Sequence, residues 1–257
     1  MQRLLREMGS VLVAFSGGVD STLVLKIAHD ILGSRALAVT AVSPTFPQIE
    51  LEWTRRLAGE IGARYHILEG DQLQIPDFVR NDAHRCYHCK TDLYQALGSL
   101  RQELQMEAIV DGTNMDDLGD ERPGVTAARE WGVRSPLVEA HLTKTEVREL
   151  ARDLGLSNWD KPAAACLSSR IPRGVEITRE KLTRIEQAEA VLFREGLRQV
   201  RVRDHADVAR IEVERAEIPV LLDPTRRRRV SRALKALGFR FVTVDLEGYR
   251  QGSTNDA

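Results

Sequence analysis

Residues 11–28 have the sequence VLVAFSGGVDSTLVLKIA, in which a short apolar run leads through a glycine-containing loop into a helical stretch. The adjacent glycines allow a tight turn and a close approach of the backbone to a ligand. Exposed N–H groups of such a loop and of the following helix start bind anions, and the hydroxyls of Ser16 and Ser21 add donors. The loop matches neither GxxxxGK[ST] nor GxGxxG. Between a strand and a helix, SGGVDS predicts a phosphate-binding turn, with an ordinary glycine-rich connection as the alternative.

The same alternation of strand and helix continues outward from this loop. Apolar, β-branched runs at 10–15, 36–42, 64–68 and 107–112 are separated by helical stretches, the clearest at 22–32 and 48–61. Short buried strands between helices indicate a mostly parallel sheet with right-handed crossovers. TKTE at 143–146 predicts a capping box that opens one more helix towards Leu154. We therefore expect an α/β, doubly wound parallel sheet.

The pattern changes near the sequence NWDKPAAACLSSRIPRG at 158–174, which holds two prolines and many small residues without a clean period. We interpret this stretch as a long functional loop or linker. A long helix at 178–195, alternating runs at 199–203 and 208–213, further helical sequence and a closing strand at 239–246 follow it. These elements predict a second, smaller α+β domain. We place the first domain at residues 1–170 and the second at 171–257.

Composition narrows the class of protein. The 257 residues are 42% hydrophobic and 29% charged, with a formal net charge of −1, as in globular proteins with a proper core. A net charge near zero gives no global attraction to nucleic acid or to an anionic membrane, and the apolar runs are too short to span a bilayer. Without a recognisable secretory signal, three cysteines indicate reduced thiols rather than a disulfide framework. We expect a cytoplasmic protein.

A second polar loop follows a predicted strand. IVDGTN at 109–114 places Asp111, Gly112, Thr113 and Asn114 after an apolar run. In an open α/β sheet, this loop lies at the carboxyl edge, where such sheets bind ligands. A surface loop rich in turn-forming residues is the alternative. The phosphate loop at the same edge favours a nucleotide site.

The SGGVDS loop resembles the PP-loop of the ATP pyrophosphatase family, which has an adenine-nucleotide α-hydrolase-like fold. The resemblance implies cleavage of ATP between its α and β phosphates, adenylation of a carboxylate or carbonyl oxygen, and displacement of AMP by nitrogen or sulfur. It also implies Mg²⁺ to offset the phosphate charge, with Asp20 as a weaker candidate for a metal contact. The ATP site implied by the resemblance consists of Ser16, Gly17, Gly18, Val19, Asp20, Ser21, Thr40, Ser43, Asp111, Gly112, Thr113 and Asn114.

Nearly the whole chain resembles one branch of these enzymes, the LarE family of sulfur transferases in nickel-pincer nucleotide biosynthesis and lactate racemase maturation. The resemblance rests on the PP-loop, DGTN, ACLSSRIPRG and the RVRDH…ARIEV sequence. It implies adenylation of a carboxylate of pyridinium-3,5-biscarboxylic acid mononucleotide and attack by Cys166 on the mixed anhydride. In single-cysteine members, cleavage of the Cβ–S bond then leaves sulfur on the substrate and dehydroalanine in the protein.

The sequence RCYHCK adds Cys86 and Cys89 and so departs from the single-cysteine pattern. Other members of the family hold a [4Fe–4S] cluster with three cysteines, which implies Cys86, Cys89 and Cys166 as ligands here. Three alternatives stay open: a zinc site completed by His84 or His88, a CxxC redox disulfide, and unliganded thiols with Cys166 alone as the sulfur donor.

Two arginines alternate with valines in the second domain. Arg201 and Arg203 share one face of a predicted strand, and the solvated face of a small sheet is the simplest interpretation. The resemblance instead makes both candidates for holding the substrate phosphate, and Arg170 a candidate substrate contact. We expect Glu189 to face solvent, and the four arginines at 226–229 to form a solvated helix face.

The resemblance thus implies an ATP-dependent sulfur transferase that acts on a small nucleotide substrate, and the composition predicts binding to neither nucleic acid nor membrane. The resemblance further implies a homo-oligomer, in which the second domain takes part, and contact with other nickel-pincer biosynthesis proteins. The alternatives are a tRNA-thiolating PP-loop enzyme, an ammonia-using PP-loop amide ligase and a nucleotide-binding regulatory protein without turnover.

Overall fold

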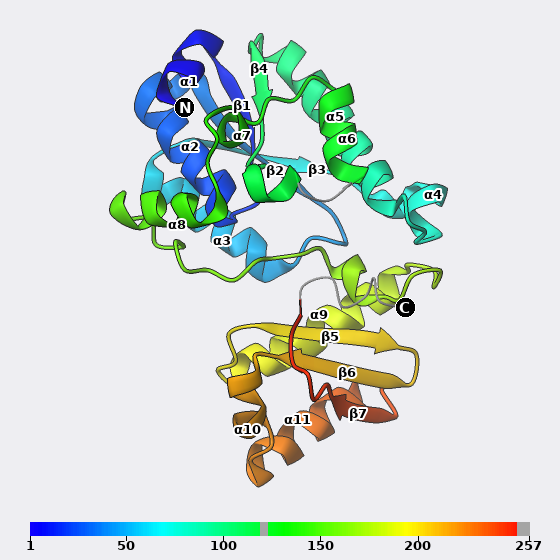
Figure 1. Cartoon of the computed structure of the whole chain (residues 1–257). Helices are drawn as coiled ribbons and strands as arrows, with labels where there is room; N and C mark the ends of the chain where they lie inside the picture. Colours follow the sequence, from blue (N-terminus) through cyan, green and yellow to red (C-terminus); the bar gives the residue numbers. More distant parts are fainter. Residues whose placement is uncertain (119–122, 251–257) are drawn as a thin grey trace. The chain divides into compact units, whose positions relative to one another are not determined.

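The structure is a computed structural model that describes residues 1–118 and 123–250. These residues form two compact units, the first made of Met1–Gln72 with His84–Ala164, and the second of Leu73–Ala83 with the chain from Ala165 onward (Figure 1). The division therefore falls before the expected position near residue 170, and residues 73–83 differ from the expectation in joining the second unit. Their anchor is Asn81, whose side-chain amide donates to the carbonyl oxygens of Pro172 and Val175 at 2.7 and 2.9 Å.

A parallel sheet forms the centre of the first unit, as predicted. Its described strands are β1 (Val11–Ala14), β2 (Ala36–Val42), β3 (Arg64–Glu69) and β4 (Ala108–Val110), in the order β3-β2-β1-β4. The chain runs outward from β1 to β3 and then returns to the other side of β1 with β4. The strand order thus reverses between β1 and β4, and open α/β sheets bind ligands beyond the carboxyl ends of the strands at such a point.

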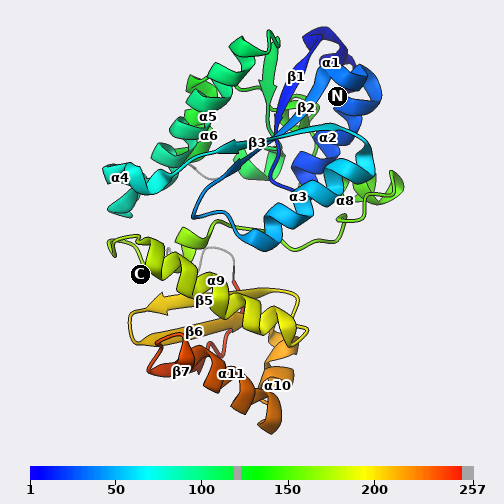
Figure 2. The same cartoon turned by 180° about the vertical axis from the view of Figure 1, so that it is seen from behind.

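Helices cover both faces of this sheet (Figures 1 and 2). Val11 and Val13 of β1 pack into one core and Leu12 into another, because successive side chains of a strand point to opposite faces. The first core is closed by α1 (Gln2–Met8), α2 (Val19–Leu32), α3 (Gln48–Ile61), α7 (Pro136–Glu139) and α8 (Lys144–Asp153). The second is closed by α5 (Arg85–Glu103) and α6 (Pro123–Glu130).

Several predicted elements have the predicted bounds. The strand at 36–42 and the helix at 48–61 are β2 and α3, and the capping box of α8 is present. There the Glu146 carboxylate accepts from the Thr143 backbone N–H at 2.8 Å. Helix α2 begins at Val19 rather than at residue 22, so the phosphate loop runs directly into its first turn. Short 3₁₀ turns in this unit lie at Gly33–Arg35 and Met115–Leu118, and Gln72–Gln74 forms another where the two units divide.

The second unit is the predicted small α+β fold. Its sheet has the order β5-β6-β7, with β5 (Val200–His205) antiparallel to β6 (Val208–Val213) and β7 (Phe241–Val244) parallel to β6. Helices α9 (Arg179–Arg194) and α11 (Pro224–Ala236) pack with α10 (Ile218–Leu221) into one core with this sheet. The other short elements are α4 (Pro76–Val79), η4 (Leu167–Arg170) and η5 (Arg215–Glu217).

Within the two described stretches, no helix is both long and apolar enough to cross a membrane.

Candidate active site

The SGGVDS loop connects β1 to α2 and is closed by its own hydrogen bonds. The Ser21 hydroxyl donates to the Gly18 carbonyl at 3.1 Å and accepts from the Ser16 backbone N–H at 3.3 Å. Gly17 has a φ of +72°, in the left-handed region that disfavours other residues. Val19 is the first residue of α2, so the loop presents its N–H groups at a helix N-terminus. This arrangement suits an anion such as a phosphate.

The DGTN loop reaches the PP-loop at the reversal point of the sheet. A Cβ atom on Gly112 would lie only 2.7 Å from the backbone nitrogen of Ser21, so the two loops are in contact through a residue that must lack a side chain. The Asn114 amide donates to the Asp20 carboxylate at 3.0 Å. The Asp111 carboxylate accepts from the Thr113 hydroxyl at 2.8 Å, which holds the turn. The two predicted nucleotide-binding loops are therefore adjacent.

Asp20 already has a cationic partner. Its carboxylate forms an ion pair with the Nζ of Lys144, the first residue of α8. A Mg²⁺ contact through Asp20 would have to compete with this ammonium group. Asp20 is therefore better suited to joining α2 to α8 than to contacting a metal ion.

Thr40 and Ser43, the other predicted ATP residues, lie at the end of β2. The buried Thr40 hydroxyl donates to the Phe15 carbonyl at 2.7 Å and so joins the ends of β1 and β2. The hydroxyls of Ser43 and Thr45 are 3.0 Å apart just beyond the strand.

Asn158 and Lys161, which the sequence did not single out, hold the PP-loop through the Gly17 carbonyl. The Gly17 carbonyl accepts from the Asn158 amide at 3.1 Å and from the Lys161 ammonium at 3.3 Å. The same amide donates to the Thr22 hydroxyl at 3.0 Å, and Lys161 is paired with Glu50 at 2.5 Å. These contacts to the Gly17 carbonyl fix the orientation of the loop backbone. The only sequence signal was their place in the polar stretch at 158–174.

Two of the three cysteines lie in the first unit, at the start of α5. Cys86 is exposed and Cys89 is half-buried; neither forms a disulfide, and their spacing of three places them on the same side of the helix. Adjacent thiols of this kind suit neighbouring thiolate ligands of a metal cluster. Cys166 belongs to the second unit. Among the residues that the structure describes, no group of three or more His, Cys, Asp or Glu side chains is arranged to hold a metal ion.

Cys166 directly precedes η4, and Arg170 holds its backbone. One guanidinium nitrogen of Arg170 donates to the carbonyl oxygens of Ala165 and Cys166 at 2.6 and 2.9 Å. The thiol sulfur of Cys166 lies 3.0 Å from the Ser168 hydroxyl. Arg170, predicted as a substrate contact, therefore positions the cysteine that is the predicted sulfur donor.

Arg170 is itself held by a buried carboxylate. Glu189 of α9 accepts from its Nε at 2.8 Å and from its Nη2 at 2.9 Å, and from the Val202 backbone N–H at 3.0 Å. Burial opposes the charge of Arg170, but Glu189 outweighs it and raises the pKa of the guanidinium. Glu189 is only 4% exposed, so the expectation that it faces solvent is wrong. The long helix places this carboxylate under β5, where it joins the helix, the strand and η4.

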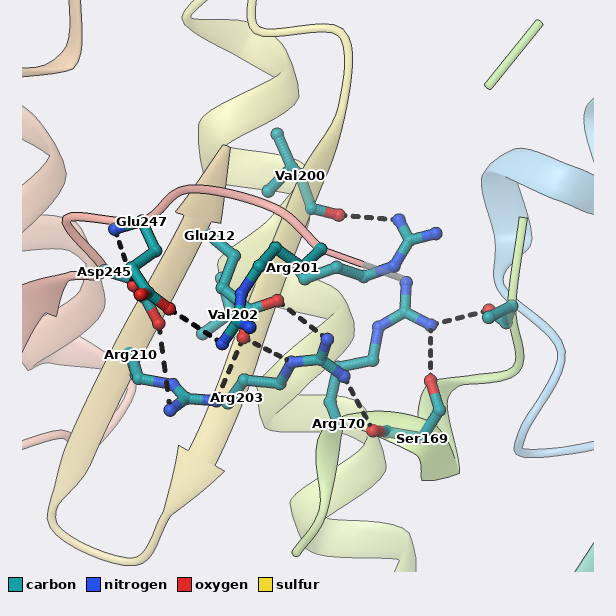
Figure 3. Close-up of polar contacts among 12 residues, drawn as sticks. Ser169, Arg170, Val200, Arg201, Val202, Arg203, Arg210, Glu212, Asp245 and Glu247 are labelled. Carbon is teal, nitrogen blue, oxygen red and sulfur yellow. Dashed lines mark hydrogen bonds and ion pairs between the residues drawn. The ribbon is translucent and has the colours of Figure 1, made fainter. Parts of the chain in front are cut away.

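The arginines of β5 are also buried, so the solvated-face interpretation is wrong. Figure 3 shows Arg170, Arg201 and Arg203 gathered beside β5, and the two strand arginines are 6% and 4% exposed. Arg203 donates through two nitrogens to Glu212 at 3.0 and 2.7 Å and through a third to the Ser169 carbonyl at 2.8 Å. Arg210 also contacts the Glu212 carboxylate, at 3.0 Å.

Arg201 is close enough to Arg170 and Arg203 to be repelled by their charges. Its guanidinium stacks over the Tyr249 ring at 5.3 Å and donates to the Val200 carbonyl at 2.7 Å. Burial lowers the pKa of Arg201, and the neighbouring charge of Arg170 lowers it further. An added anion would relieve this repulsion, and the planar guanidinium fork suits phosphate and carboxylate.

A parallel α/β sheet with an SGGVDS loop at its reversal point defines the PP-loop class of nucleotide-binding domains, which ATP and Mg²⁺ fit. In agreement, the model of the asparagine synthase family matches residues 1–95.

The chain is 44% identical over 255 residues to an uncharacterized protein of Synechocystis, and the matched region covers 99% of this chain and 95% of that protein. It is 42% identical over 253 residues to the pyridinium-3,5-bisthiocarboxylic acid mononucleotide synthase of Lactiplantibacillus plantarum, with coverages of 98% and 91%. An uncharacterized protein of Methanocaldococcus jannaschii is 30% identical over 240 residues, with coverages of 93% and 90%. The chain belongs to the LarE family of PP-loop enzymes, the family of the Lactiplantibacillus synthase.

Proposed function

We propose that this protein is an ATP-dependent sulfur transferase. It adenylates a carboxylate of pyridinium-3,5-biscarboxylic acid mononucleotide and converts it to a thiocarboxylate, a step of nickel-pincer nucleotide biosynthesis. The observation that carries the proposal is the 42% identity, over 98% of the chain, to a synthase of the corresponding bisthiocarboxylic acid mononucleotide. The contact between the PP-loop and the DGTN loop supports the ATP-dependent half of the reaction.

In the first half-reaction, a substrate carboxylate oxygen attacks the α-phosphorus of ATP. The bond from that phosphorus to the bridging oxygen breaks, and pyrophosphate leaves with the electron pair. The N–H groups of the PP-loop and the hydroxyls of Ser16 and Ser21 hold the leaving phosphates, in a loop whose Gly17 carbonyl is fixed by Asn158 and Lys161. Bound Mg²⁺ would offset the phosphate charge.

In the second half-reaction, the Cys166 thiolate attacks the acyl carbon and AMP leaves. Removal of the Cα proton of Cys166 and cleavage of its Cβ–S bond then release the thiocarboxylate and leave dehydroalanine. Cys166 is among the groups whose charge raises the pKa of Arg170, so the guanidinium and the thiolate attract each other.

We propose that Cys86, Cys89 and Cys166 hold a [4Fe–4S] cluster, which would supply sulfide in place of the cysteine sulfur when bound. The donor chemistry fits, because none of the three cysteines forms a disulfide and two share one side of α5. Metal content distinguishes the cluster from two alternatives. A site completed by His84 or His88 would contain zinc, and an unliganded CxxC would contain no metal.

The test uses protein purified without oxygen and incubated with ATP, Mg²⁺ and the biscarboxylic acid mononucleotide. We expect AMP, pyrophosphate and thiocarboxylate in equal amounts. Iron and acid-labile sulfide at about four per chain, lost in Cys86→Ala, would support the cluster. Absence of iron, with loss of one H₂S from the mass of the chain, would support a single-use Cys166. No pyrophosphate release with this substrate, ammonia-dependent amide formation or thiolation of tRNA would contradict the proposed function.

We further propose that Arg201 and Arg203 bind the phosphate of the mononucleotide. Arg201→Gln and Arg203→Gln are each expected to raise the KM for the mononucleotide about tenfold, because each removes charge-assisted hydrogen bonds to an anion. The KM for ATP should stay within about twofold of the wild type, which steady-state kinetics would measure. Arg210→Gln is the matched control, since Arg210 contacts the same Glu212 from β6. An equal rise in both KM values would contradict this assignment.

We propose a homo-oligomer in the cytoplasm that binds neither nucleic acid nor membrane and cooperates with other nickel-pincer biosynthesis proteins. This proposal rests on the resemblance of the sequence to the family, and light scattering would measure the assembly.

A further inference from the structure

The run of four arginines at 226–229 is divided between two sides of α11. Arg226 and Arg229, three residues apart, both pair with Glu195 near the end of α9, at 3.3 and 2.6 Å. Asp223 caps the helix by accepting from the backbone N–H groups of Thr225 and Arg226 at 3.1 and 2.9 Å. This part of the run has an ordinary structural role, because it attaches α11 to α9.

The other basic residues of the helix line a cavity. Its volume is about 690 Å³, and its wall contains Arg227, Arg228, Arg232 and Lys235 of α11. The apolar side of the cavity is formed by Ile211, Leu221, Val242 and Val244, from β6, α10 and β7. A basic wall therefore faces an apolar floor, within the second unit alone.

These four cations are unbalanced. In the described part of the chain, the side chains of Arg227, Arg228, Arg232 and Lys235 form neither ion pairs nor hydrogen bonds, and all four residues are exposed. Like charges on adjacent turns of one helix repel each other. An anion in the cavity would relieve this repulsion and accept hydrogen bonds from several donors at once.

The cavity is separate from the arginines proposed to bind the substrate phosphate. Along β6, Ile211 faces the cavity, whereas its neighbours Arg210 and Glu212 belong to the polar group of Figure 3. Adjacent strand residues point to opposite faces of a sheet. The cavity therefore lies on the helix-covered face, and the buried arginine group lies on the other.

We propose that this cavity binds a small aromatic phosphate, with the ring against Ile211, Val242 and Val244 and the phosphate at Arg227 and Arg228. The volume lies in the range of ordinary small-ligand sites, which combine apolar walls with a few polar groups. Arginine forks suit a phosphate. The formal net charge of −1 gives the chain no general affinity for polyanions, so the charge here is local. This site is independent of the proposed sulfur transfer.

Pyridoxal 5′-phosphate is a suitable probe because it carries a ring, a phosphate and an aldehyde. The Lys235 amine attacks the aldehyde carbon and water leaves, which gives an imine. Borohydride then delivers a hydride to the imine carbon and yields a stable secondary amine. Peptide mass spectrometry of the labelled full-length protein measures the modification of each lysine as a function of probe concentration.

We expect saturable labelling of Lys235. In Arg227→Ala/Arg228→Ala, the half-saturating concentration should rise at least about tenfold, because two charged donors are lost. Ser231→Glu, which adds a carboxylate to the cavity wall, should have the same effect. The matched control is Arg226→Ala/Arg229→Ala, which removes the same charge from the same helix but outside the cavity. It should change the half-saturating concentration by less than about twofold, since the charges of Arg226 and Arg229 are already offset by Glu195.

Competition distinguishes the ring from the phosphate. Phenyl phosphate should displace the probe at a concentration at least about tenfold below that of inorganic phosphate, because burial of the ring adds apolar contact. Labelling that rises linearly without saturation, or an equal shift in the two double variants, would overturn the proposal. Equal potency of the two competitors would overturn the aromatic specificity and leave a phosphate site.

Discussion

Cys166→Ala is expected to lose thiocarboxylate formation completely while it still releases pyrophosphate from ATP in the presence of the mononucleotide. The two half-reactions use different groups. The PP-loop and the DGTN loop belong to the first unit, whereas Cys166 belongs to the second. Removal of the sulfur therefore eliminates the acceptor of the acyl group but leaves the groups that hold ATP. The measurement is pyrophosphate release together with thiocarboxylate, quantified by mass spectrometry in the same reaction.

Cys166→Ser is the matched control for shape. Its hydroxyl keeps the hydrogen-bonding position next to Ser168, so η4 should be undisturbed, and the loss of thiocarboxylate should equal that of the alanine variant. Cys86→Ala separates the two sulfur sources, since it should still give one thiocarboxylate per chain if Cys166 is the direct donor. Substantial thiocarboxylate from Cys166→Ala would refute the role of this cysteine. A parallel loss of pyrophosphate release would indicate that the residue serves the adenylation step instead.

The elements with strong local signals were predictable from sequence. β2 and α3 have the predicted bounds because each has a regular pattern of apolar residues with a clear boundary. The turn at Gly33–Arg35 precedes the strand, and Pro47 and Gly62 flank the helix. The place of 73–83 in the second unit had no such signal. It depends on Asn81 contacting residues about 90 positions further along the chain. Local periodicity contains no information on a contact of that kind.

The same distinction applies to the ATP site. The carboxyl-edge rule correctly brought DGTN to the PP-loop, because the rule follows from the parallel strand order alone. Asn158 was missed, although its contact with Gly17 holds that loop, since the two residues are 141 positions apart. An asparagine in a loop has no sequence feature that distinguishes a buried anchor from a turn former.

The arginine group shows where an alternating pattern is insufficient. Alternation correctly placed Arg201 and Arg203 on the face opposite Val200 and Val202. The alternation did not predict that these arginines are buried. A period of two shows which residues share a face of the strand, but not whether other parts of the protein cover that face. Here the Ser169 carbonyl accepts from Arg203, and Glu212 supplies the balancing charge.

Glu189→Ala is expected to lower the free energy of unfolding by about 3–5 kcal/mol, because it leaves the charge of Arg170 buried without its carboxylate. Arg170 is 2% exposed, and both oxygens of Glu189 contact it at 2.8 and 2.9 Å. The Val202 N–H loses its acceptor in the same variant. Urea unfolding followed by far-ultraviolet circular dichroism would measure the change. Tryptophan fluorescence would not, because Trp53, Trp131 and Trp159 all belong to the first unit.

Glu195→Ala is the matched control, since Glu195 directly follows the same helix and also pairs with arginine. Its partners Arg226 and Arg229 have side chains that are 28% and 56% exposed, so water replaces much of the lost interaction and the cost should be several-fold smaller. Glu189→Gln should fall between the two, because its amide oxygen can still accept from Val202 while the charge is lost. Equal costs at 189 and 195 would contradict the argument. Because Arg170 also holds the Cys166 carbonyl, Glu189→Gln should slow thiocarboxylate formation more than pyrophosphate release, even under conditions where the chain stays folded.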